Sequence, residues 1–202
     1  MKKDAILKNL SEQVFQLSRD KLTEKDKTLL GIPLHIWLLA ELFAENVKKC
    51  TTAERLKEIK HINIFILYDL YVEIKGDIYL SKNKDFDGTK VKDPPKKTFK
   101  GNLMYAALVA IFSPEQLKEL PDKRIVKVTR IFLQNFDEIE EELGITIDDI
   151  KGRPVFQHRT LAEYLAARWL CNNLQDCQSF IRDHLSQSGF HVLRSMVDKI
   201  RG

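Results

Sequence analysis

The sequence predicts a mainly α fold, in which a helical domain is followed by a winged-helix domain with one small β-hairpin. Three observations lead to this prediction. Apolar residues recur at intervals of three and four along most of the chain, which is the spacing of amphipathic helices. Ser, Thr and Pro stand where several of these helices would begin. Residues 145–158 combine two short apolar runs around Gly and Pro, a pattern typical of a hairpin.

The composition is that of an ordinary globular chain. Its net charge of +4 is too small to indicate a nucleic-acid partner by itself. The three cysteines, Cys50, Cys171 and Cys177, do not predict a disulfide framework and fit a reducing compartment. The longest apolar stretch, residues 29–40, is too short to span a bilayer, and no secretory signal is visible. We therefore expect a cytoplasmic protein that uses neither a membrane nor nucleic acid as a partner.

Residues 1–80 are predicted to form the C-terminal part of a helical domain. Helical spacing is clear over residues 3–19, and a second, nearly all-apolar helix runs from Pro33 to residue 43. A shorter helix is expected over residues 51–60. The next stretch is rich in Ile, Phe and Tyr, which favours a strand. Its apolar positions nevertheless follow helical spacing, so we predict a helix there: Leu67, Leu70, Tyr71, Ile74 and Ile78.

Residues 81–100 are predicted to be a linker or loop, because they contain Gly88, Pro94, Pro95 and several lysines. A basic surface for nucleic acid is the alternative interpretation. It is opposed by the lack of aromatic residues interleaved on a defined element.

Residues 101–174 are predicted to form the winged-helix domain, and residues 175–202 the start of a following helical region. Ser113 and Gln116 stand at capping-box spacing with Pro between them, so a helix should begin there. One long helix is expected from residue 125 to residue 143, followed by the hairpin with its turn at 151–154.

The stretch from Val155 to Trp169 joins the hairpin to a strongly predicted helix. Thr160 and Glu163 have the spacing of a capping box, and apolar residues follow on a broad face: Leu161, Tyr164, Leu165, Ala167 and Trp169. His158 and Arg159 precede this helix, where backbone amides and the helix dipole favour an anion such as phosphate. The alternative is a structural junction in which Arg159 is simply solvated.

The amino-acid sequence of this stretch resembles that of a known family. Phe156-x-His-Arg-Thr-Leu-Ala-Glu-Tyr-Leu-Ala-Ala-Arg-Trp169 is similar to the end of the winged-helix domain in NACHT-type NTPases, which belong to the STAND class of signal-transduction ATPases. The likeness is to arthropod members with ankyrin or leucine-rich repeats. Gly31-x-Pro33 resembles an element of STAND helical domains, and residues 67–73 and 192–198 resemble segments that flank the winged helix.

The resemblance implies a regulatory fragment that senses a nucleotide. In STAND proteins the winged helix folds over bound ADP in the resting state. His158 would contact the β-phosphate and Pro33 would pack on the adenine, with the NTPase core supplied by the same protein or in trans. Exchange for ATP would release the winged helix and permit oligomerisation. The family also implies signal transduction in innate immunity.

We predict no catalytic or metal site in this fragment. Residues 145–149 imitate a magnesium-binding Walker B strand, but the chain has no Gly-x4-Gly-Lys-Ser/Thr phosphate loop. Cys177, His184 and His191 are seven apart and could suggest zinc, yet ligand pairs at short spacing are lacking. The parent protein would be an ATPase.

Two other functions stay open at this point. The first is a stand-alone helical adaptor that binds a NACHT partner in trans. The second is a DNA-binding winged helix, which is disfavoured by the acidic run at residues 137–142, because carboxylates there would repel the phosphates.

Overall fold

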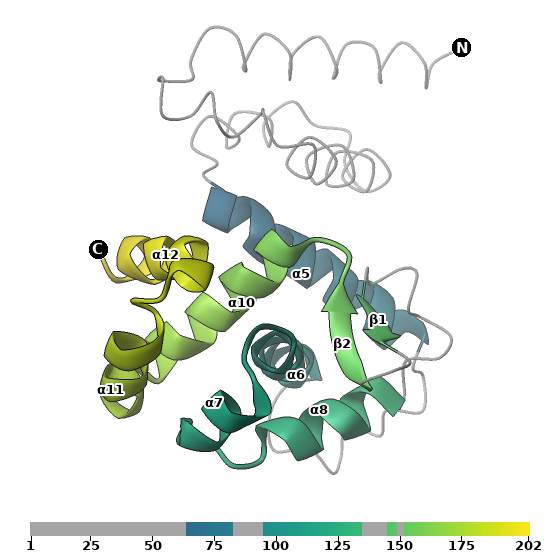
Figure 1. Ribbon diagram of the computed structural model, residues 1–202. Helices are drawn as coiled ribbons and strands as arrows, with labels where there is room; N and C mark the ends of the chain where they lie inside the picture. The colour runs from purple at the N-terminus through teal and green to yellow at the C-terminus, as the bar shows by residue number, and fades with distance from the viewer. Residues whose placement is uncertain (1–63, 83–94, 135–144, 149–151) are drawn as a thin grey trace, which may run out of the picture. The chain divides into compact units, whose positions relative to one another are not determined.

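Figure 1 shows the computed structural model of the chain, which describes residues 64–82, 95–134, 145–148 and 152–202. These residues are mainly helical, as predicted. In chain order the elements are α5 (Ile64–Lys82), α6 (Pro95–Ile111), α7 (Pro114–Glu119), α8 (Ile125–Gln134), β1 (Ile145–Asp148), β2 (Arg153–Phe156), α10 (Arg159–Asn172), α11 (Leu174–His184), the short 3-10 helix η2 (Ser188–Phe190) and α12 (His191–Arg201). None of the described helices combines the length and apolar character needed to cross a lipid bilayer.

The chain divides into two compact units, Met1–Ile74 and Lys75–Gly202, and the division falls inside α5. The helix predicted over residues 62–79 is therefore present as α5, despite its strand-favouring composition. The helices predicted over residues 3–19, 33–43 and 51–60 lie outside the described residues. The four predicted segments stay predictions, with their boundaries at residues 80, 100 and 174.

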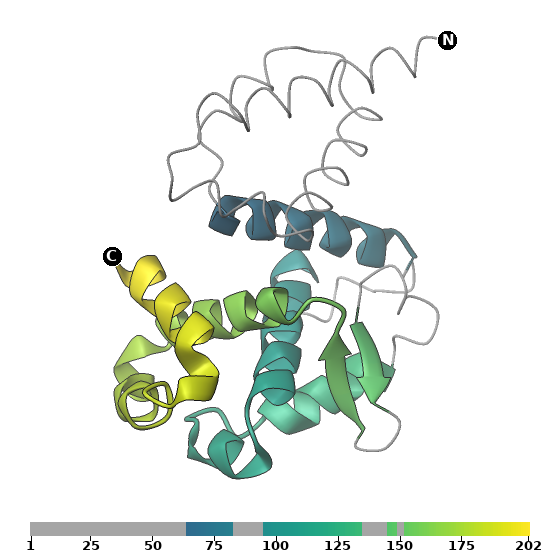
Figure 2. The ribbon, with the colours of Figure 1, turned by 45° about the horizontal axis from the view of Figure 1, so that its top comes forward.

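Helix α6 lies at the centre of the second unit. It packs against α7, α8, α10 and β2, and Figure 2 shows it between α10 and α8. Its first residue is Pro95, so the prediction of a loop is wrong for residues 95–100. Proline fits the first turn of a helix, and Phe99 is buried in the core, so tertiary packing outweighs the local lysines and prolines. Residues 83–94 of the predicted linker lie outside the described residues.

Helices α6 and α10, which pack on each other, both carry small buried side chains. Ala106 and Ala107 on α6 are completely buried, and so are Ala166 and Ala167 on α10. Side chains of this size allow two helix backbones to approach closely. The same helix α10 also packs against α12, so α10 is enclosed from two sides.

Two aromatic clusters tie the helices together. In the first, the ring of Tyr79 lies 5.0 Å from that of Phe99 and 6.1 Å from that of Phe132, so it joins α5, α6 and α8. In the second, Phe112 at the end of α6 contacts Phe180 of α11 in an edge-on arrangement, with 5.0 Å between ring centroids. Phe190 of η2 packs on the same Phe112 ring at 5.4 Å. Each cluster buries large apolar surfaces between helices that are distant in sequence.

The predicted capping box opens α7. The backbone N–H of Gln116 donates to Ser113 Oγ at 3.3 Å, and the backbone N–H of Ser113 donates to Gln116 Oε1 at 2.9 Å. Pro114 occupies the start of the helix and Leu120 ends it, one residue before Pro121. This helix start is therefore determined by its local sequence.

Strands β1 and β2 form the predicted antiparallel hairpin, in which Ile145 pairs with Phe156 and Asp148 with Arg153. The predicted turn was too long, because Arg153 and Pro154 belong to β2. The reason is a tertiary contact. Arg153 Nε donates to the Val109 carbonyl at 3.1 Å, and its Nη2 donates to the Phe112 carbonyl at 2.6 Å. The strand thereby satisfies carbonyls at the C-terminal end of α6.

Candidate functional site

The candidate site lies where β2 leads into α10. His158 is the N-cap residue of this helix, with extended backbone angles, and its carbonyl accepts a hydrogen bond from the Leu161 N–H at 3.0 Å. The imidazole is half-buried and makes no capping hydrogen bond of its own. Burial lowers the pKa of His158 from its ordinary value, because the charged ring loses hydration. The neutral imidazole is therefore favoured near neutral pH.

The capping box predicted for Thr160 and Glu163 is wrong. Helix α10 begins at Arg159, so Thr160 is already inside its first turn and cannot act as the N-cap. The Glu163 carboxylate instead accepts a hydrogen bond from Arg159 Nε at 3.0 Å. These two residues are four apart on the helix, which allows an ion pair that competes with the capping arrangement.

Arg159 is thus held by protein groups. Besides its ion pair with Glu163, its Nη2 donates to the Gly189 carbonyl of η2 at 3.4 Å. Of the two predicted cationic donors at the helix start, Arg159 is paired with a carboxylate one turn away, and the His158 ring favours its neutral form near neutral pH. The alternative of a structural junction with a solvated arginine is compatible with the structure, because the Arg159 side chain is 71 % exposed even though it pairs with Glu163.

Helix α10 forms a rigid support for His158. The predicted apolar face is confirmed, since Leu161, Tyr164, Leu165, Ala167 and Trp169 are all buried. The ring of Trp169 packs edge-on against that of Tyr105 on α6, with 6.3 Å between centroids. The residues that determine the position of His158 are therefore part of the core of the second unit. Pro33, the other predicted nucleotide-binding residue, lies outside the described residues.

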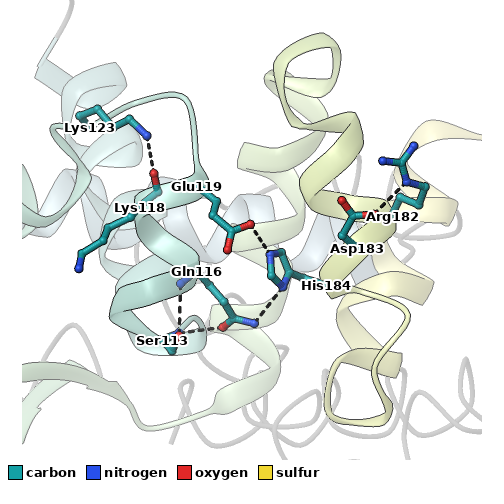
Figure 3. Close-up of polar contacts among 8 residues, drawn as sticks. All are labelled: Ser113, Gln116, Lys118, Glu119, Lys123, Arg182, Asp183 and His184. Atoms are coloured by element: carbon teal, nitrogen blue, oxygen red, sulfur yellow. Dashed lines mark hydrogen bonds and ion pairs between the residues drawn. The ribbon is translucent and has the colours of Figure 1, made fainter.

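The three residues considered for zinc each have a different environment. Cys177 is fully buried, and burial together with Asp176 raises the pKa of its thiol to about 11. Figure 3 shows His184 between Glu119 and Gln116 of α7; its Nε2 lies 2.7 Å from the Glu119 carboxylate and its Nδ1 3.4 Å from Gln116 Nε2. His191 Nδ1 lies 3.1 Å from the Ser188 carbonyl. In the part of the chain that the structure describes, no three potential ligands come together as a metal site.

The contact in Figure 3 has a structural role. Gln116 Nε2 can only donate, so His184 Nδ1 accepts from it, while His184 Nε2 lies within hydrogen-bond distance of the Glu119 carboxylate; both ring nitrogens therefore have a partner. Gln116 also belongs to the capping box of α7. One side chain on α11 is thereby tied to the start of α7, and this connection was not predicted from the sequence.

A groove between α6, α7, α8 and β2 was also missed. It has a volume of about 550 Å³ and is lined by Val109, Pro114, Leu117, Lys118, Asp122, Lys123, Ile125, Val126, Thr129, Arg130, Leu133, Gly152 and Arg153. The i, i+4 series Ile125, Thr129 and Leu133 is the sequence signal that could have indicated it, because a threonine interrupts an apolar stripe.

Comparison with models of known protein families, with curated proteins and with solved structures finds no match. The resemblance to NACHT-type NTPases accordingly depends on the motif residues quoted from the sequence.

Proposed function

We propose that this chain is a regulatory, nucleotide-sensing segment of a cytoplasmic NACHT-type signalling NTPase. It would hold ADP in the resting state, together with a nucleotide-binding core, and would have no catalytic activity alone. The observation that carries the proposal is the position of His158. The motif histidine is the N-cap of α10, directly after the hairpin, and the helix behind it is buried.

The local chemistry supports a phosphate contact at this position. The N-cap residue His158 makes no side-chain capping hydrogen bond, and the first-turn amides and the positive end of the helix dipole favour an anion at this position. An imidazole N–H can donate a hydrogen bond to a phosphate oxygen, and the contact strengthens when phosphate draws a proton onto the ring. The Arg159–Glu163 pair adds no net charge. His158 is therefore the residue whose removal should affect ADP.

Buried packing also supports a regulatory role. His158 is attached to α10, which packs on α6 and α12, so its position is tied to the whole second unit. Loss of a phosphate contact at His158 would free the unit as one body, and release of a rigid body is what a nucleotide-controlled switch requires.

The proposal is tested by ADP release from a chain that joins these residues to its upstream nucleotide-binding core. Reading the transcript to its true start shows whether such a core is encoded in frame. A fluorescent ADP analogue should leave the His158→Ala variant at least about tenfold faster than wild type, because a hydrogen bond to a charged group contributes about 1.5–3 kcal/mol.

The matched control is His191→Ala, which removes an exposed imidazole at the start of α12. It should release the ADP analogue at the wild-type rate. Equal release rates for wild type and His158→Ala would rule out the proposed phosphate contact.

A further inference from the structure

The groove of about 550 Å³ has mostly apolar walls, formed by Val109, Pro114, Leu117, Ile125, Val126 and Leu133. Its volume lies within the range of pockets that take small organic molecules. Val126 is about half exposed, so part of the apolar wall is open to solvent. These walls favour an apolar ligand body.

A buried hydroxyl lies at this groove. Thr129 is only 2 % exposed, and its Oγ1 has no hydrogen-bond partner in the described structure. A threonine inside a helix commonly donates to the carbonyl four residues earlier, yet this contact is not made here. A buried hydroxyl without a partner is destabilising. Because this oxygen is almost inaccessible to solvent, an acceptor atom on a ligand would relieve that penalty only after the Thr129 side chain rotates toward the groove.

The polar lining of the groove is mainly cationic. Lys118, Lys123, Arg130 and Arg153 all border it, against the single carboxylate of Asp122. That carboxylate is already engaged by Arg124, whose Nε and Nη2 donate to it at 3.0 and 2.9 Å.

Within the described ranges, Arg130 takes part in none of the ion pairs. Lys118 is not in an ion pair there either, although its charge interacts electrostatically with the Glu115 carboxylate one turn earlier. The described lining of the groove therefore has an excess of positive charge beside an unpartnered hydroxyl.

We propose that this groove binds a small carboxylate with an apolar body, such as a medium-chain fatty acid. The apolar walls would bury the chain, and a carboxylate oxygen would accept the hydrogen bond that Thr129 does not make. Lys118 and Arg130 would attract and hold the negative charge at the rim. Such a ligand would bind independently of any nucleotide at His158, so this inference does not depend on the proposed function.

The test is calorimetric titration of the full chain with octanoate, octanol and octylammonium. These three ligands have the same apolar chain and differ in head group. We expect octanoate to bind at least tenfold more tightly than either of the others, because its charge and its acceptor oxygens both match the groove. Equal affinities for the three ligands, or no octanoate binding, would overturn the proposal.

Variants show whether binding occurs in this groove. Lys118→Ala/Arg130→Ala removes two exposed cations and should weaken octanoate binding at least tenfold without changing the thermal unfolding temperature. The matched control is Arg194→Ala/Lys199→Ala, which removes two exposed cations from α12 and should bind octanoate as wild type does. Equal effects of the two double variants would place the anion elsewhere and refute the site.

Thr129→Val separates the hydroxyl from the general fit of the groove. Valine keeps the shape of threonine and removes the buried hydroxyl, so the free protein should be at least as stable. Octanoate affinity should nevertheless fall several-fold. An unchanged affinity in this variant would show that Thr129 does not contact the ligand.

Discussion

Replacing Arg159 with alanine removes the cation that balances the Glu163 carboxylate, and the structure determines how much this should cost. The Arg159 side chain is 71 % exposed, whereas that of Glu163 is only 9 % exposed. An exposed i, i+4 ion pair contributes only about 0.3–0.5 kcal/mol. A buried acceptor without its donor costs about 1–3 kcal/mol. Because Glu163 keeps a little access to water, we expect Arg159→Ala to lower the free energy of unfolding by about 1–1.5 kcal/mol.

The assay is urea unfolding of a Trp37→Phe background, in which Trp169 on α10 alone reports by fluorescence. Glu163→Gln keeps an acceptor for Arg159 and loses the charge. The double variant Arg159→Ala/Glu163→Gln should therefore lose less free energy of unfolding than the sum of the losses in the two single variants. The expected coupling energy is about 0.5–1 kcal/mol.

The exposed pair Arg182–Asp183 is the matched control, because its 2.9 Å contact is as short but both side chains are largely solvated. Arg182→Ala should lower the free energy of unfolding by less than Arg159→Ala does, because water screens this exposed pair. The reasoning about burial is refuted if Arg159→Ala costs no more than Arg182→Ala, or if the double variant is additive to within about 0.3 kcal/mol. Arg159 would then be an available cation at the start of α10, as the sequence first indicated.

Two further predictions concern a helix cap and a titrating ring. Ser113→Ala should lower the free energy of unfolding by about 1 kcal/mol in urea unfolding, because it removes the acceptor for the Gln116 amide. Ser195→Ala, on the exposed side of α12, should change this free energy by less than about 0.5 kcal/mol, and a similar loss in both variants contradicts the capping role. The folded-state pKa of His158 is lowered, so protonation favours the unfolded chain, and stability should fall as the pH drops through the ordinary value of 6.5. His158→Gln should lose less stability between pH 7.5 and pH 5.5 than wild type, and identical losses would show that burial of this ring has no energetic effect.

Local signals predicted several elements of the fold correctly. The helical spacing in α5 outweighed its strand-favouring composition, and Ser113 with Gln116 defined the start of α7 from four consecutive residues. The antiparallel hairpin before α10 was also predicted. In each case the information lies in residues that are close together in the chain, so single-sequence reasoning can reach it.

The incorrect predictions depend on contacts between distant residues. Phe99 in the core extends α6 back to Pro95, and Arg153 extends β2 because it reaches carbonyls of α6. At the candidate site, the position of His158 at the helix start followed from the motif. The burial of the His158 ring and the Arg159–Glu163 ion pair could not be predicted from the motif. Neither spacing nor composition shows whether the Glu163 carboxylate caps the helix start or pairs with Arg159.

The enclosure of α10 between α6 and α12 has a consequence for synthesis on the ribosome. Helix α6 emerges before α10, whereas α12 is translated last of the three. Until residues 191–201 have left the exit tunnel, the face of α10 that α12 covers has no partner within the second unit. A nascent chain that pauses before this point would expose an apolar helix face to solvent, and general chaperones bind such surfaces. Helix α12 thus completes the burial of α10 only after residues 191–201 have been translated.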